Sequence, residues 1–525
     1  MQKLYSVLNA ENNNTKPENG SSYFKFFVGG GNNHPTVRYV LKRRSWWHRE
    51  RREKFVGQCV EESSNDSGSE EADPGMGRGA HFIWTQWKKT ELVGHLRTHR
   101  GPTKLTYSKL DANYHLANKK ALFLNVSAYY RAMGLDPFQV AIPLTFHIKS
   151  TRDPEYANFE AKFNQLAKDK KSHNIWIIKP GENTNRGSGI EVANSLGEIR
   201  GIIQSFASQY GDRTSIVQKY IEKPLLISGR KFDVRAFALI TSVNGHLQAY
   251  MYRDCYFRTS SKPFDLSNLQ SRQVHLTNDA IQMNSEDYGK FESANKLSIN
   301  DFQRYLDQNF PAKSIHFMRD LFPVMERLVT DSIRAVYKQI DPSRKQNSFE
   351  IFGYDFMIDE HFRVQMIEAN TNPCLEIQCP LLARIIPELL DNSFRIALDP
   401  LYQPPALGSA DAVDLRAVDD SCKKQGNKLR RKFELLQQVK YSLIFNQQTD
   451  APELDKLFAK EQSANQQLMA EIVEEEAIVE KVALEDEKKA AELGGDDEDE
   501  PLLAAAEPVG SGEGEQGQFV LSDSD

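Results

Sequence analysis

The chain has 525 residues, 40% hydrophobic and 10% aromatic, enough to bury a large core in two or three domains or subdomains. Its first residues hold no apolar stretch of signal-peptide length, and no window holds the roughly 20 apolar residues of a membrane-spanning helix, so we expect a cytoplasmic protein without a membrane partner. Five cysteines without a CxxC pair argue against a disulfide framework and a zinc site.

Charge is distributed unevenly along the chain. Residues 451–525 contain 22 acidic residues and 5 lysines, a net charge of −17, so residues 1–450 carry +11. A basic body with an acidic tail favours an acidic partner. We expect residues 451–525 to be an acidic, largely disordered tail.

The first 80 residues divide by composition into three segments. We expect residues 1–22 to be disordered, 23–56 to form a basic aromatic segment and 57–80 to be a flexible acidic insertion. The basic segment contains KRRSWWHRERREK, which we interpret as a cationic helix with a solvated face. Its cations are Lys42, Arg43, Arg44, Arg49, Arg51, Arg52 and Lys54. No fold motif supports a nucleic-acid interface here, so we expect no nucleic-acid partner.

Strand and helix patterns alternate through the rest of the chain, which indicates an α/β (α+β) fold. The Asn244-Gly245 pair predicts a hairpin turn between two strands. Strands are predicted at 174–180, 215–227, 231–242 and 247–260, and helices at 301–310, 314–340, 380–398 and 425–448. We expect an N-terminal α/β domain at 81–150, a central subdomain at 151–230, a C-terminal subdomain at 231–403 and a helical extension at 404–450.

Two apolar strands within FEIFGYDFMIDEHFRVQMIEANTNPCLE carry carboxylates that packing alone does not favour. Asp355 interrupts the first strand, and Glu368 and Asn370 interrupt the second. A buried, ionised carboxylate costs several kcal/mol unless a cation or strong donors accompany it. Two carboxylates and an amide are hard oxygen ligands that suit Mg²⁺, and protein-bound Mg²⁺ is commonly shared with substrate phosphates. Glu368 and Asn370 are two residues apart on a strand, so they share one face.

Basic residues that suit phosphate groups occur upstream. Lys179 ends a strand before a turn in which Arg186 adds charge and Gly187 and Gly189 allow a close backbone approach to phosphate. Lys231, Asp233 and Arg235 alternate along KFDVR and therefore share one face of a strand, with Arg258 on the following strand. In isolation, KFDVR could equally be a surface salt-bridge strip. The two carboxylates could likewise be a buried acid paired with arginine and an N-cap acceptor.

Four ordered segments carry a resemblance to a known family: KPGENTNRGSGI, VQKYIEKPLLISGRKFDVR, FRTSSKPFDLSNLQSRQVHLTNDAIQ and FGYDFMIDEHFRVQMIEANTNP. They resemble the tubulin-tyrosine ligase and ligase-like proteins over roughly residues 80 to 400. The resemblance implies an ATP-grasp fold, in which two α/β subdomains clasp ATP and Mg²⁺. It also implies a reaction in which a carboxylate is phosphorylated to an acyl phosphate that an amine then attacks.

The resemblance also assigns roles to residues. Lys231, Arg235 and Arg258 match catalytic cations, the two arginines lying near the reacting carboxylate. Asp355, Glu368 and Asn370 match the family's metal ligands. The positions that match the nucleotide site are Lys179, Arg186, Gly187, Gly189, Gln218, Lys219, Tyr220, Lys231, Asp233, His275, Thr277 and Asn278. Taken alone, the HLTN segment that holds the last three is as readily a helix start, with Thr277 or Asn278 as the cap.

The implied function is ligation of an amino acid to the acidic C-terminal tail of tubulin, at the cytoskeleton and including a cilium or flagellum. The sequence resembles the tyrosine-adding enzyme in some segments and glycine-adding members in others, so tyrosination and glycylation both stay open, with glutamylation the poorer match. The expected partners are tubulin or microtubules and free Tyr, Gly or Glu. The alternative is a catalytically inactive, microtubule-binding protein that keeps the fold.

Overall fold

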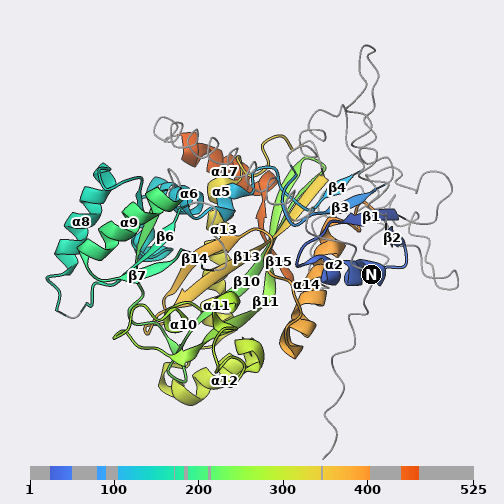
Figure 1. The fold of residues 1–525 in the computed structure, drawn as a ribbon. Coiled ribbons are helices and arrows are strands. Elements are labelled where there is room, and N and C mark those ends of the chain that lie inside the picture. Colours follow the sequence, from blue (N-terminus) through green and yellow to red (C-terminus); the bar gives the residue numbers. More distant parts are fainter. Residues whose placement is uncertain are drawn as a thin grey trace, which may run out of the picture. The chain divides into compact units, whose positions relative to one another are not determined.

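The computed structural model describes residues 24–49, 80–89, 105–170, 172–181, 187, 189–210, 214–344, 347–402 and 439–459. Two sheets organise these residues. The larger sheet has eleven strands and the smaller has four, and α-helices pack on both (Figure 1). The mixture of sheets and helices confirms the predicted α/β class.

The larger sheet has the order β12-β11-β10-β13-β4-β3-β1-β2, with β14 on β13, β15 on β11 and β9 on β10. The long central strands are antiparallel, whereas β1 to β4 pair in parallel. The strands are β1 (Phe24–Val28), β2 (Trp47–Arg49), β3 (Phe82–Trp84), β4 (Thr106–Tyr107), β9 (Leu226–Ile227), β10 (Arg230–Val243), β11 (His246–Pro263), β12 (Lys296–Ser298), β13 (Asn347–Ile358), β14 (Val364–Asn370) and β15 (Tyr441–Asn446).

The turn between β10 and β11 confirms the prediction made from its sequence. Asn244 and Gly245 have φ values of 52° and 78°, so both adopt the left-handed conformation. A two-residue hairpin turn with positive φ at both positions matches the natural twist of the flanking strands. The turn sets the register of the nearer part of the hairpin, as far as Ala238 opposite Met251. An irregularity between Ala236 and Ala238 then shifts the register, and this shift places Arg258 directly opposite Asp233.

Alternation along β10 divides its side chains between two cores. Ala236, Ala238 and Ile240 face a core built with α6 and α13. Phe237 and Leu239 face the opposite core, built with α2 and α14. Lys231, Asp233 and Arg235 have the same parity as Phe237, so the charged residues occupy the outer end of a face that becomes apolar further along the strand. The helices are α2 (His34–Lys42), α6 (Lys119–Ala132), α13 (Phe322–Val336) and α14 (Pro380–Ala397).

The smaller sheet has the order β5-β8-β6-β7 and is antiparallel. Aromatic side chains fill its core, where Phe159 lies edge-on to Trp176 at 5.0 Å between ring centroids. Its elements are β5 (Thr145–Ile148), α8 (Pro154–Leu166), β6 (Trp176–Pro180), β7 (Glu191–Ala193), α9 (Leu196–Tyr210) and β8 (Ser215–Lys219).

Short helices complete the described structure. Around the outer end of β10 lie α10 (Arg272–His275) and α11 (Asp279–Gln282), followed by the 3₁₀-helix η3 (Ser293–Asn295). The others are α5 (Tyr114–Ala117), α7 (Pro137–Val140), α12 (Ile299–Asn309), the 3₁₀-helix η4 (Pro311–Lys313), the π-helix η5 (Phe317–Leu321) and α17 (Gln447–Ala459).

The prediction of a solvated cationic helix near residues 42–54 is wrong for the part that the structure describes. Residues 47–49 form β2, and Trp47 is buried against Phe24 and Tyr402. Arg44 is also buried and forms ion pairs with Asp391 and Asp399. Burying the large apolar surface of Trp47 in the sheet core is favourable in free energy, and an exposed helix would leave that surface in water.

The predicted helix at 425–448 is wrong at its C-terminal end. Tyr441–Asn446 forms β15, which pairs with β11 and buries Tyr441 and Phe445. The helix α17 begins only at Gln447. In the part of the chain that the structure describes, no helix is both long and apolar enough to cross a bilayer.

Candidate functional site

A buried network of four charged side chains lies across β10, β11 and β13. Arg235 donates from Nε to Asp355 Oδ1 at 2.6 Å and from Nη2 to Asp355 Oδ2 at 3.2 Å. Arg258 donates from Nε and Nη2 to the two oxygens of Asp233, each at 2.6 Å. Arg258 Nη2 also lies 2.7 Å from Asp355 Oδ2, so the two pairs form one network. Two guanidiniums and two carboxylates balance in charge, which makes their burial tolerable.

The network leaves Asp355 strongly acidic. Burial by itself would raise the pKa of Asp355, but Arg235 and Arg258 outweigh that effect and hold the pKa well below its usual range. Glu368 is the direct cross-strand neighbour of Asp355, and a side-chain hydrogen bond with Glu368 lowers the pKa of Asp355 further. Two carboxylates this close attract a cation.

A β-bulge turns Glu368 toward this network. Asp355 pairs with Glu368 and Phe356 with Met366, which leaves Ile367 as an extra residue in β14. The bulge reverses the alternation, so Met366 enters the core while Glu368 and Asn370 face the site. Asn370 Nδ2 donates to Glu368 Oε1 at 3.0 Å, which confirms the prediction that these two side chains share one face.

Lys231 forms hydrogen bonds with His275 of the HLTN segment and with Tyr220, which directly follows β8. Its Nζ donates to the Tyr220 hydroxyl at 3.0 Å and to the His275 carbonyl at 2.7 Å. His275 donates from Nε2 to the Asn268 carbonyl, so Nδ1 accepts the Tyr220 hydroxyl at 2.9 Å. Burial lowers the pKa of Lys231 to about 7, an effect that Asp233 partly offsets.

Lys179 occupies a similar environment at the end of β6. Its Nζ donates to Gln218 Oε1 at 2.9 Å, and Gln218 is held in turn by Thr145. Burial lowers the pKa of Lys179 to about 8, and Lys119 adds to this lowering. Burial reduces the protonated fraction of both lysines. A bound anion would favour their protonated forms, so the two lysines suit an anionic ligand.

The glycine turn contacts the HLTN segment. Gly187 has φ of +76°, and a Cβ there would lie 2.8 Å from Ile281 Cδ1, so this position accepts only glycine without rearrangement. Its carbonyl accepts a hydrogen bond from Arg272 Nη2 at 2.6 Å. Thr277 Oγ1 donates to Asp233 Oδ2 at 2.5 Å. The alternative in which HLTN begins a helix is confirmed in position, because Asn278 is the N-cap residue of α11, although its side chain makes no capping bond.

One cleft brings most of the predicted residues together. Its polar lining is Lys119, Lys179, Gly187, Lys231, Asp233, Arg258, His275, Thr277, Asn278, Asp355, Glu368 and Asn370. Its apolar lining is Ile177, Ile190, Leu276, Met357 and Ile367. Apolar side chains beside a cationic patch suit a flat base attached to phosphates.

The other described residues of the predicted set do not line the cleft. Gln218, Tyr220 and Arg235 form hydrogen bonds with side chains that do line it. Lys219 forms an ion pair with Glu222. Gly189 is described but is not among the lining residues. Arg186 lies outside the described residues.

Sequence reasoning missed Lys119 and the apolar lining. Lys119 opens α6 and lies 3.9 Å from Glu368 Oε2. Alternation could have indicated two apolar members, because Ile177 lies two residues before Lys179 and Met357 two residues after Asp355 on the same strands. No comparable signal marked Lys119, which lies far from the other site residues in the sequence.

A buried carboxylate on β13 joins the segment before α6 to the end of β14. Glu350 accepts hydrogen bonds from Lys109 Nζ at 2.9 Å, from the Leu110 backbone at 3.1 Å and from Asn113 Nδ2 at 3.1 Å. Thr371, which directly follows Asn370, donates to the same carboxylate. Glu350 therefore positions the strand end that carries the predicted metal ligands.

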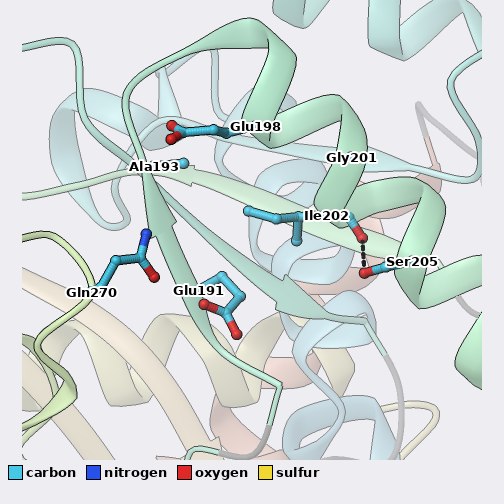
Figure 2. A pocket seen from close by; sticks show the side chains of 7 residues that line it. All are labelled: Glu191, Ala193, Glu198, Gly201, Ile202, Ser205 and Gln270. Carbon is cyan, nitrogen blue, oxygen red and sulfur yellow. Dashed lines mark hydrogen bonds between the residues drawn. The ribbon is translucent and has the colours of Figure 1, made fainter.

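A second hollow, of about 300 Å³, lies beside β7 and α9 (Figure 2). It is lined by Glu191, Ala193, Glu198, Gly201, Ile202, Ser205 and Gln270. Two carboxylates and no cation line it, so it does not suit a phosphate-bearing ligand. The cleft at Asp355 is the stronger candidate.

The residues of the cleft fit the two cofactors that the family resemblance implies. Asp355, Glu368 and Asn370 converge through adjacent strands and offer oxygen ligands of the kind that Mg²⁺ prefers. No cluster of three or more His, Cys, Asp or Glu side chains suited to a metal occurs among the described residues, so the amide and substrate phosphates would complete the coordination. Lys179 and Lys231, which line the same cleft, would supply cations for the phosphates.

Known proteins are similar to part of this chain. Tubulin glycylases 3B and 3A of Drosophila melanogaster are 35% and 37% identical over 240 and 237 residues, which cover 45% and 44% of this chain and 30% and 23% of the fly proteins. Tubulin monoglycylase TTLL3 of Mus musculus is 34% identical over 262 residues, 47% of this chain and 28% of the mouse protein. These matches thus span less than a third of each relative. Residues 104–405 match the tubulin-tyrosine ligase family, and the chain belongs to that family.

Proposed function

We propose that the chain is an ATP-dependent ligase of the ATP-grasp type that adds glycine to the acidic C-terminal tail of tubulin. The observation that carries the proposal is the cross-strand pair of Asp355 and Glu368 beside a cleft lined by buried lysines. The names of the relatives, tubulin glycylase and tubulin monoglycylase, favour glycine over tyrosine. The cytoskeleton, including that of a cilium or flagellum, would be the place of action.

Different residues of the cleft would bind different parts of the nucleotide and the metal ion. Lys179 and Lys231 bind phosphate oxygens, and the apolar side chains beside them hold the base. Asp355, Glu368 and Asn370 would hold Mg²⁺, which supplies positive charge to the transferring phosphoryl group. Arg258 stands between Asp233 and Asp355, where its guanidinium stabilises negative charge on the reacting groups.

The reaction balances as two transfers. An oxygen of the acceptor glutamate carboxylate takes the terminal phosphoryl group of ATP, and ADP leaves. The glycine nitrogen then attacks the acyl carbon, the bond from that carbon to the phosphate oxygen breaks, and phosphate leaves with the electron pair. The glycine ammonium loses two protons in all, one to the departing phosphate and one to solvent. Because water would hydrolyse the acyl phosphate, the buried position of the arginines favours ligation.

Incorporation of labelled amino acids into purified tubulin tests the proposal. We expect ATP-dependent incorporation of glycine, with tyrosine and glutamate incorporated poorly, and loss of incorporation in Glu368→Gln. A matched control is Glu360→Gln, on the exposed turn between β13 and β14, which should retain activity. Equal activity of wild type and Glu368→Gln, or preferential use of tyrosine, would contradict the proposal.

A further inference from the structure

A second ion pair lies one strand beyond Arg258 and has no role in the site described so far. Lys296 on β12 is the direct cross-strand neighbour of Arg258. Its side chain is fully buried and forms an ion pair with Asp279 at the start of α11. Its Nζ also donates to the Ala294 carbonyl at 3.0 Å. The Asp279 side chain, in contrast, is 23% exposed. The pair thus has a buried cation and a carboxylate that solutes can reach.

Asp279 lies on the same side of the sheet as the two arginines. Arg235 is the cross-strand neighbour of Tyr256, as Lys296 is of Arg258. Burial raises the pKa of the Tyr256 hydroxyl, Arg235 and Arg258 lower it, and Asp279 raises it. Because paired residues share one face of a sheet, Arg235, Arg258 and Lys296 lie on the same face, and the ion pair with Lys296 holds Asp279 at that face.

On this face of the sheet, positively and negatively charged groups both have polar atoms that form no hydrogen bond among the described residues. Nε and Nη2 of each guanidinium bind carboxylates, and no hydrogen bond from Nη1 of Arg235 or Arg258 occurs among the described residues. Lys296 binds Oδ1 of Asp279, and no described residue donates a hydrogen bond to Oδ2. Guanidinium donors and a carboxylate acceptor thus occur on the same face of the sheet.

The net charge of the cluster defines the ligand that it suits. Arg235, Arg258 and Lys296 carry three positive charges, and Asp233, Asp355 and Asp279 carry three negative charges. A ligand that carries both a carboxylate and a cation offers one partner to each kind of group. A free amino acid is a zwitterion and adds no net charge. Its carboxylate matches the Nη1 donors, and its ammonium group matches Asp279 Oδ2.

We propose that Asp279 binds the ammonium group of the donor amino acid and that Lys296 acts as a positioning residue for Asp279. The inference rests on the proposed function and names the donor subsite of the same site. In the strand order β12-β11-β10, Lys296 lies on the other side of β11 from the strand that carries Lys231. We expect the donor nitrogen to approach the acyl phosphate from the β12 side.

The first test replaces Asp279 by asparagine, which keeps the shape and removes the charge. Hydrogen bonds to charged groups contribute enough that we expect KM for glycine to rise about 10- to 100-fold. KM for ATP and KM for tubulin should stay within about twofold of wild type, because Asp279 is not among the residues that line the nucleotide cleft. An unchanged KM for glycine, or an equal rise in KM for ATP, would overturn the inference.

A second variant separates binding from folding, since Asp279→Asn leaves Lys296 buried without its partner. Asp279→Asn combined with Lys296→Met removes both charges. We expect the melting temperature to recover toward wild type while KM for glycine stays high. Recovery of KM together with stability would show that the pair is structural only and would refute the donor site.

Calorimetric binding of glycine to the full chain provides a readout without turnover. Wild type should bind glycine, glycine methyl ester should bind more weakly because it lacks the carboxylate, and Asp279→Asn should bind glycine about 10- to 100-fold more weakly than wild type. Wild type that binds glycine but ligates nothing would contradict the proposed function alone. Wild type that ligates glycine with unchanged binding in Asp279→Asn would contradict the donor site alone.

Discussion

Arg258 binds two carboxylates at once, with Nη2 2.6 Å from Asp233 Oδ2 and 2.7 Å from Asp355 Oδ2. Asp233 belongs to the predicted nucleotide set, and Asp355 belongs to the predicted metal set. Burial would lower the pKa of Arg258, but Asp233 and Asp355 raise it well above its usual value, so the guanidinium stays charged. One side chain thus joins the two halves of the site.

We therefore expect Arg258→Met to destabilise the protein strongly. Removing one partner from a buried ionic network leaves uncompensated charge and costs about 3–5 kcal/mol. Mg²⁺ with ATP should restore part of this loss, because a divalent cation replaces the guanidinium charge beside Asp355. Chemical denaturation with and without Mg²⁺ and ATP measures both effects. The control is Arg253→Met, an exposed position on the same strand that should change stability little.

The lowered pKa values of Lys179 and Lys231 predict proton uptake when nucleotide binds. Their pKa values of about 8 and about 7 leave both lysines partly neutral in the range between those values. Phosphate oxygens favour the charged form and raise both pKa values, so binding takes up protons there and weakens as pH rises. Calorimetry in buffers of different ionisation enthalpy measures the uptake. Lys231→Met should reduce it, and equal uptake in the variant would exclude Lys231 as its source.

The same groups set the pH dependence of stability without nucleotide. The pKa of Lys231 is about 7 in the folded protein, against an ordinary lysine value of 10.5 in the unfolded chain. The unfolded chain therefore binds more protons between these values, and the contribution of Lys231 to the free energy of unfolding rises with pH across this window. In Lys231→Met the rise should be smaller. A steeper rise in the variant would show that other groups dominate.

The shared face of Glu368 and Asn370 and the hairpin could be predicted from the sequence because both depend on local rules. Period-two alternation placed Glu368 and Asn370 on one face, and Asn244-Gly245 specified its own turn type. The bulge at Ile367 was not predicted, since its extra residue is visible only in the pairing of β13 with β14. Without the bulge, Glu368 would share a face with the core residue Met366.

Interactions between distant residues were also beyond the sequence patterns. Arg44 lies in a run of cations that is typical of a solvated surface, yet its partner Asp399 is 355 residues away. Lys109 and Glu350 are 241 residues apart. Alternation and helical periodicity describe neighbours along one segment, so neither could indicate that these charges meet in the interior.

We predict that Glu350→Ala will lower stability by about 3–5 kcal/mol, because Lys109 would lose its buried partner. The double variant Glu350→Leu with Lys109→Met replaces the pair by apolar side chains and should recover much of that loss. Denaturation midpoints of the single and double variants give the comparison. A double variant as unstable as Glu350→Ala would mean that the bonds to Asn113 and Thr371, rather than the ion pair, maintain this region.

The strand β15 lies beyond the part of the chain that matches the family, yet it completes the larger sheet. Tyr441 and Phe445 are 1% exposed, and Leu454 of α17 is 4% exposed. Tyr337 and Lys338 of the main body contact Asp455 of α17. A chain that ends at residue 459 should therefore melt close to the full chain.

A chain that ends at residue 438 should melt at a much lower temperature or aggregate. Its loss of β15 exposes the edge of β11 at Gln248–Tyr252, together with the apolar residues that Tyr441 and Phe445 cover. Burying each large side chain contributes about 1.5–3 kcal/mol, so the combined loss approaches the whole stability of a domain. Equal melting temperatures for the two truncations would show that the family-matched region is stable without β15.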